Sequence, residues 1–113
     1  MAPSDSLELM QGTVDILVLR TLAWAPMHGY AISRWIRERT AGALALENAA
    51  LYPALHRLER RKLVTATWGT SETGRRAKFY ELTPLGRKQL RTATATWRSY
   101  VDAVLKVLSP AEG

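Results

Sequence analysis

The spacing of apolar residues predicts two short helices in the first third of the chain. A first amphipathic helix ends near Trp24, and Thr13 is a plausible N-cap for it. Pro26 and Gly29 then interrupt the helical pattern. Residues 30–40 restore it, with apolar side chains on one face and charged side chains on the other.

A third helix follows, and it contains a proline. Leu51, Leu55 and Leu58 recur at steps of 4 and 3, so they form a core face. A proline in a helix interior costs about 3 kcal/mol, but it is tolerated near the start, where backbone donors lack helical partners. We therefore expect the helix to begin near Ala49, which places Pro53 where its missing N–H does little harm.

A β-hairpin is predicted next. Residues 63–68 and 77–83 are rich in β-branched and aromatic side chains, and residues 69–76 between them are turn formers with two arginines. Alternate residues of a strand lie on the same face of it. These residues are Val64, Ala66 and Trp68 on the first strand and Lys78, Tyr80 and Leu82 on the second.

The last predicted element is a long helix. Thr83 is its expected N-cap, Pro84 its first residue, and the pattern continues to Leu108. Steps of 4 and 3 along this helix are typical of a coiled-coil seam. Two interpretations stay open, packing within the same domain and dimerisation, of which we favour dimerisation for the last three turns. The seam residues are Leu90, Thr94, Trp97, Val101, Val104 and Leu108.

Length and composition limit the architecture to one domain with an appendage. The 113 residues contain 47% hydrophobic and 23% charged side chains and no cysteine, so disulfides and thiolate sites are excluded. We find no signal-peptide pattern and no membrane span, and expect a cytoplasmic protein. The expected parts are a folded domain at 8–82, a dimerisation helix at 83–108, and flexible termini at 1–7 and 109–113.

The net charge of +6 is concentrated in the middle of the chain. Residues 33–62 hold seven Lys or Arg against three Asp or Glu, and residues 63–91 hold six against two. Clustered cations of this kind suit a polyanion such as DNA, although a solvated basic face would look the same.

The order of elements separates these two alternatives. Three helices followed by a basic hairpin form a winged helix-turn-helix, a mainly α fold with a small β-hairpin. In this fold the third helix enters the major groove of DNA. The hairpin, or wing, would then place Arg75, Arg76 and Lys78 against flanking phosphates or a minor groove.

Four stretches together resemble the PadR family of bacterial transcriptional regulators, over about Leu9 to Leu90. They are "LMQGTVDILVLRTLA", "HGYAI", "LYPALHRLERRKLV" and "AKFYELTPLGRKQL". The resemblance implies a homodimer joined by its C-terminal helix, which binds a pseudo-palindromic operator in double-stranded DNA, usually as a repressor. It also implies release by a small-molecule effector in some members.

The resemblance leaves two interpretations of Trp97. In one subgroup of the family, a tryptophan on the C-terminal helix stacks on planar ligands in a pore between the subunits. Trp97 lies at a similar place in this chain, so it either lines such an effector pocket or fills the dimer seam, and we favour the seam.

The sequence departs from the family just before "LYP". The family usually has Gly and then Ser or Thr there, which cap the third helix and can touch DNA, whereas this chain has Ala49 and Ala50. We expect Asn48 to remain free for DNA, and Arg57 either to bind DNA or to pair with Glu59 or Glu47. The candidate DNA contacts are Asn48, Ala50, Tyr52, Pro53, His56, Arg57, Arg75, Arg76 and Lys78.

No catalytic or metal-binding pattern is recognisable, so we expect neither an enzyme nor a cofactor. His28 is expected to cap a helix or to pack, rather than to bind a ligand. The alternative to a DNA-binding regulator is a winged-helix module that binds an acidic protein through its basic face.

Overall fold

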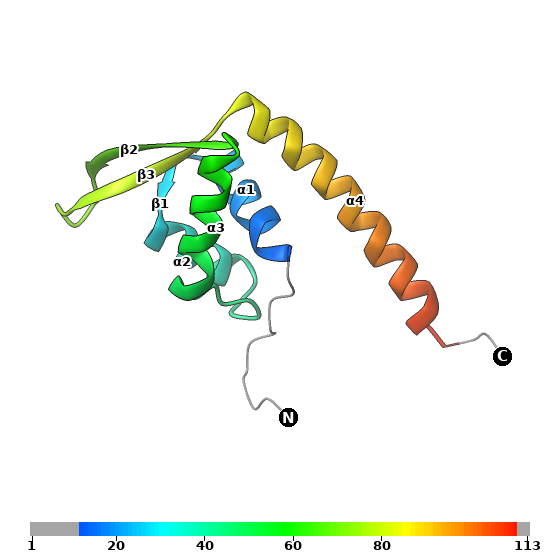
Figure 1. Ribbon diagram of the computed structural model, residues 1–113. Coiled ribbons are helices and arrows are strands. Elements are labelled where there is room, and N and C mark those ends of the chain that lie inside the picture. Colours follow the sequence, from blue (N-terminus) through cyan, green and yellow to red (C-terminus); the bar gives the residue numbers. More distant parts are fainter. Residues whose placement is uncertain (1–11, 111–113) are drawn as a thin grey trace.

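The computed structural model describes residues 12–110, and Figure 1 shows their arrangement. Four helices and a β-hairpin follow one another as the sequence predicts, and a short third strand completes a small antiparallel sheet. The termini expected at 1–7 and 109–113 lie outside the described residues, apart from residues 109–110. The elements are α1 (Thr13–Trp24), β1 (Met27–His28), α2 (Gly29–Arg39), α3 (Asn48–Arg60), β2 (Val64–Thr70), β3 (Arg76–Leu82) and α4 (Pro84–Leu108).

The first helix ends at Trp24 as predicted, but its cap differs. Gly12 precedes the helix with φ 91°, a left-handed conformation that favours glycine, and it makes no side-chain cap bond. Thr13 is the first helical residue. The expectation that Thr13 is the N-cap is therefore wrong, because a glycine one position earlier makes the turn into the helix.

The sheet has a third strand that the sequence did not predict. β1 lies in the stretch expected to be a plain break, and it pairs with β3 through Met27↔Tyr80 and His28↔Phe79. The strand order is β1-β3-β2. This short pairing attaches the start of α2 directly to the hairpin.

The hairpin shows the alternation that was predicted for its two strands. Val64 pairs with Leu82, and Trp68 pairs with Lys78, so the alternating residues share one face as expected. Both strands extend further toward the tip than predicted, and the turn shortens to residues 71–75. We refer to the β2–β3 hairpin, residues 64–82, as the wing.

The third helix begins one residue earlier than predicted. The carbonyl of Glu47 accepts hydrogen bonds from the N–H groups of Ala50 and Leu51, each at 2.9 Å, so Asn48 is already helical. Pro53 is then the sixth helical residue, and the helix lacks the bond that it would donate to the carbonyl of Ala49. The prediction that Pro53 lies too near the start of the helix to remove a hydrogen bond is therefore wrong. Ala49 and Pro53 are both exposed, so water can bind the freed carbonyl.

The core gathers around the predicted leucine face of α3. Leu51, Leu55 and Leu58 are each 0% exposed. They pack against α1, α2 and the inner face of the sheet. Burial of these side chains stabilises the fold by roughly 1.5 to 3 kcal/mol each. The surrounding buried residues include Val18, Leu22, Ile32, Ile36, Val64, Tyr80 and Leu82.

The start of α4 is fixed to the turn between α3 and β2 by its predicted cap. The Thr83 hydroxyl accepts a hydrogen bond from the N–H of Gly86 at 2.9 Å and lies 2.8 Å from the carbonyl oxygen of Lys62, to which it can donate. Gly86 is buried, and a Cβ at this position would collide with the carbonyl oxygen of Leu63. From this point α4 packs on α1 and then projects away from the domain (Figure 1).

Replacing Gly86 with alanine should therefore destabilise the protein, even though alanine is the better helix former. We expect Gly86→Ala to lower the free energy of unfolding by about 1 to 3 kcal/mol, because the added methyl group forces the two backbones apart. Urea unfolding followed by circular dichroism measures this. Lys88→Ala, on the exposed side of the same turn, is the matched control, and equal stability of the two variants would contradict the packing described.

Candidate nucleic-acid interface

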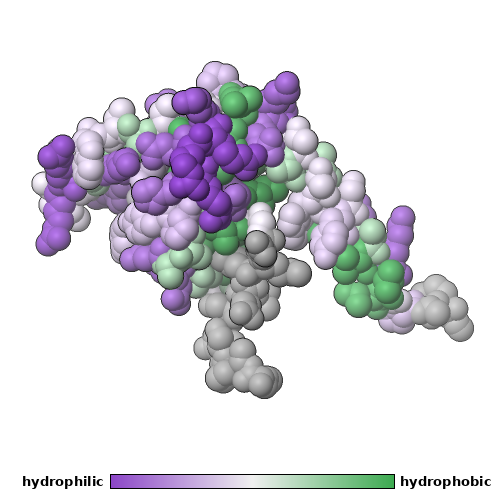
Figure 2. Space-filling model, viewed as in Figure 1, coloured by the Kyte–Doolittle hydropathy of each residue, from purple (hydrophilic) through white to green (hydrophobic). Residues whose placement is uncertain are grey.

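The outer face of α3 is polar, in contrast to its leucine face. Tyr52, Pro53, His56 and Arg57 are exposed there, and Asn48 is exposed at the start of the helix. Figure 2 shows hydrophilic side chains gathered over α3 and again at the tip of the wing. A helix with this polarity can place its outer side chains against the edges of bases.

Ala50 does not belong to this outer face. It is partly buried and packs against the hydrophobic core, one helical turn before the fully buried Ala54. We therefore leave Ala50 out of the proposed DNA contacts, because it packs against the core.

Arg57 is held by a residue far away in the sequence. Its Nη2 lies 2.7 Å from Oδ1 of Asp15, in the first turn of α1. The alternative prediction, an ion pair of Arg57 with Glu59 or Glu47, is therefore wrong. Since a guanidinium has five N–H donors and this side chain remains 47% exposed, Arg57 keeps donors available for a phosphate.

Of the three predicted wing cations, Lys78 is not at the tip. Its Nζ lies 3.6 Å from Oε1 of Glu59 and 5.7 Å from the centre of the Tyr80 ring. Lys78 therefore sits on the face of the sheet that meets α3. The other two wing cations are exposed, and Arg76 places its guanidinium 4.6 Å from the centre of the Trp68 ring.

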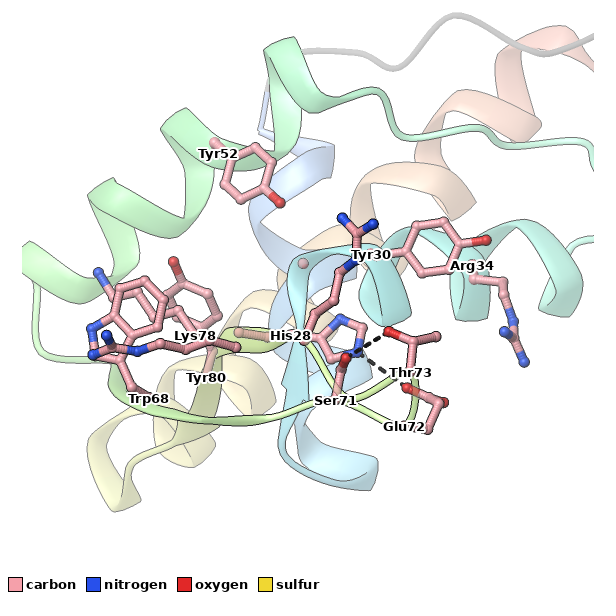
Figure 3. A pocket seen from close by; sticks show the side chains of 14 residues that line it. His28, Tyr30, Arg34, Tyr52, Trp68, Ser71, Glu72, Thr73, Lys78 and Tyr80 are labelled. Carbon is pink, nitrogen blue, oxygen red and sulfur yellow. Dashed lines mark hydrogen bonds and ion pairs between the residues drawn. The ribbon is translucent and has the colours of Figure 1, made fainter.

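A groove of about 750 Å³ separates α3 from the wing. Figure 3 shows Tyr52 of α3 on one side of it, with Trp68 and Tyr80 of the wing at one end. Tyr30 and Arg34 of α2 lie at the other end. These two residues were not predicted from the sequence, because only the β1–β3 pairing brings the start of α2 beside the wing.

The motifs "HGY" and "LYP" meet at this groove. A Cβ at Gly29 would lie only 2.5 Å from the hydroxyl oxygen of Tyr52, so the glycine makes room for the tyrosine ring. Nδ1 of His28 accepts a hydrogen bond from the N–H of Ala31 at 3.2 Å, which confirms that His28 caps α2. The stretch from residue 28 to 30 thus shapes one wall of the groove.

The electrostatic environment of the groove affects two acids. Burial raises the pKa of Tyr80, helped by the negative charge of Glu59 and by Tyr52. The Tyr80 hydroxyl therefore stays neutral in the folded protein as the pH rises past the ordinary pKa of tyrosine. The pKa of Glu72 is lowered, mainly by a hydrogen bond from its own backbone N–H and then by one from His28.

The seam of α4 lies partly open to solvent. Leu90 is buried in the domain, while Trp97 is 42% exposed and Leu108 is 71% exposed. Figure 2 shows apolar side chains gathered toward the far end of this helix. Within the described chain no element covers these last turns. The remaining seam residues, Thr94, Val101 and Val104, are partly buried.

Residues 18–92 match the model of the transcriptional regulator PadR-like family. The chain belongs to this family. PadR-like proteins are transcriptional regulators that bind DNA and typically dimerise, and they are not enzymes, which confirms the predicted class. The four helices, the small sheet and the wing confirm the predicted fold.

Solved structures agree with this membership. A transcriptional regulator from Clostridium thermocellum has a TM-score of 0.78 and 30% identity, and the match covers 85% of this chain and 93% of that one. A PadR family transcription regulator from Clostridium difficile R20291 has a TM-score of 0.72 and 30% identity, over 88% and 100% of the two chains. "Uncharacterized protein X" of Lysinibacillus sphaericus is 30% identical over 97 residues, which are 86% of this chain and 89% of that protein.

Among the helices of the described residues, none is both long and apolar enough to cross a membrane. Residues 12–110 also contain no group of three His, Cys, Asp or Glu side chains placed to hold a metal ion.

Proposed function

We propose that this PadR-like protein is a cytoplasmic homodimeric repressor that binds a pseudo-palindromic operator. The observation that carries the proposal is the contrast between the two faces of α3. Its leucines are fully buried, while its opposite face is exposed and polar beside a wing that bears arginines. In this proposal the domain at 8–82 binds DNA and the helix at 83–108 joins the subunits.

The proposed contacts divide between α3 and the wing. The outer face of α3 enters the major groove, where Tyr52 and Arg57 reach phosphates and Asn48 and His56 approach base edges. Pro53 packs on a sugar or a thymine methyl group. Lys78, tied to Glu59, adds positive charge from the wall of the groove rather than from the tip.

The two arginines near the tip have no carboxylate partner within residues 12–110, so their charge is available to DNA. These residues are Arg75 and Arg76, which we assign to the DNA backbone beside the operator. Backbone contacts contribute affinity without sequence preference.

Removing both arginines should weaken binding to every duplex. We expect Arg75→Ala with Arg76→Ala to reduce affinity for operator and random DNA alike, and to lower the salt slope by about 0.9 for each lost phosphate contact. Fluorescence anisotropy at several salt concentrations measures both quantities. The control is Arg91→Ala with Arg98→Ala, which removes the same charge from exposed positions on α4. Unchanged binding by the wing variant would refute the role of the wing.

We assign the open seam of α4 to the dimer interface. Its apolar side chains are exposed in one copy, and the same stripe on a second copy could bury them. Trp97 lies in the middle of this seam. A planar aromatic effector could stack there between subunits and release the operator.

A charge in the seam should separate the subunits. We expect Val101→Asp to sediment as a monomer, because the new carboxylate would be buried in the interface without a partner. Ala103→Asp places the same charge on an exposed side of the helix and should remain dimeric. If Val101→Asp also stays dimeric in sedimentation velocity, the subunits meet through another surface.

A further inference from the structure

His28 occupies the point where the start of α2 meets the wing. It is the second residue of β1 and pairs with Phe79 of β3. Its ring also packs edge-on against the Phe79 ring, with the centres 5.3 Å apart. Its side chain is only 12% exposed, so the ring has little freedom to turn.

The two nitrogens of this ring contact two different elements. Nδ1 accepts the hydrogen bond from the N–H of Ala31 in α2. A neutral ring that accepts at Nδ1 carries its proton on Nε2. Nε2 lies 3.4 Å from Oε1 of Glu72, so this N–H points to the carboxylate at the tip of the wing (Figure 3).

The turn that contains Glu72 is a closed unit. The N–H of Ser71 donates to the carbonyl of Arg75 at 2.8 Å, and the N–H of Gly74 donates to the carbonyl of Ser71 at 2.9 Å. Fixing Glu72 in space therefore also fixes Arg75. Glu72 itself is 76% exposed, and its carboxylate is oriented by its own backbone N–H, by His28 and by the positive charge of Arg34, of which only His28 and Arg34 lie outside the wing.

We propose that His28 is a positioning residue for DNA binding, which holds the tip of the wing beside the start of α2 through Glu72. The inference rests on the proposed function. His28 does not touch DNA in this scheme. The hydrogen bond at Nδ1 ties the His28 ring to α2, and the N–H at Nε2 restrains the wing. Arg75 and Arg76 can then contact the DNA backbone while α3 lies in the major groove.

Two substitutions at Glu72 separate the hydrogen bond from the charge. Glu72→Ala and Glu72→Gln both remove a negative charge near DNA, but only glutamine can still accept the bond from Nε2. We expect Glu72→Ala to bind operator DNA about three- to ten-fold more weakly than Glu72→Gln. In a His28→Asn background this difference should vanish, because asparagine can cap α2 but is too short to reach the wing. Equal affinities of the two variants with His28 present would overturn the proposal.

A second measurement does not depend on DNA. Amide hydrogen exchange at Gly74 should be faster in Glu72→Ala than in Glu72→Gln, because the turn has lost its restraint. Equal exchange would show that His28 does not hold the wing. If the unaltered protein bound no DNA, the proposed function would fail, while this comparison would still decide whether His28 positions the wing.

Discussion

Burial of one face of α3 is the constraint on which the other features of the protein depend. Leu51, Leu55 and Leu58 fill the space between α1, α2 and the sheet. A helix that buries one stripe of side chains must present the opposite stripe to solvent. Turning α3 about its axis would expose three leucines, so the orientation of Tyr52 and His56 is set by packing and not by DNA.

The position of the wing depends on this core and on short-range contacts at both ends of the sheet. At one end, Thr83 links the start of α4 to the turn between α3 and β2. At the other, β1 pairs with β3 and places His28 beside the tip. The groove between α3 and the wing therefore has both walls attached to one core.

The sequence predicted those features that depend on neighbouring residues. The leucine face, the Thr83 cap and the pairing of the hairpin strands all follow from local spacing. β1 escaped prediction because a two-residue strand has no periodicity and depends on its partner. The start of α3 was misplaced because a backbone carbonyl, that of Glu47, accepts its first bonds without a capping side chain.

The interface was predicted less completely than the fold, because more of its contacts join residues that lie far apart in the sequence. Arg57 and Asp15 are 42 positions apart, so no local pattern indicates their ion pair. Ala50 could have been assigned to the core, since it lies four residues before Ala54, on the stripe that the leucines define. Lys78 has the expected register, but its pairing with Glu59 depends on how α3 crosses the sheet.

The most direct test compares the affinity of the protein for its operator with that for a scrambled duplex of equal length and composition. The operator would first be selected from genomic fragments. Fluorescence anisotropy between about 50 and 200 mM salt should show the operator bound on the order of 1,000-fold more tightly, with both affinities falling steeply as salt rises. Equal affinity for the two duplexes, or binding that salt does not weaken, would contradict sequence-specific recognition by α3 and the wing.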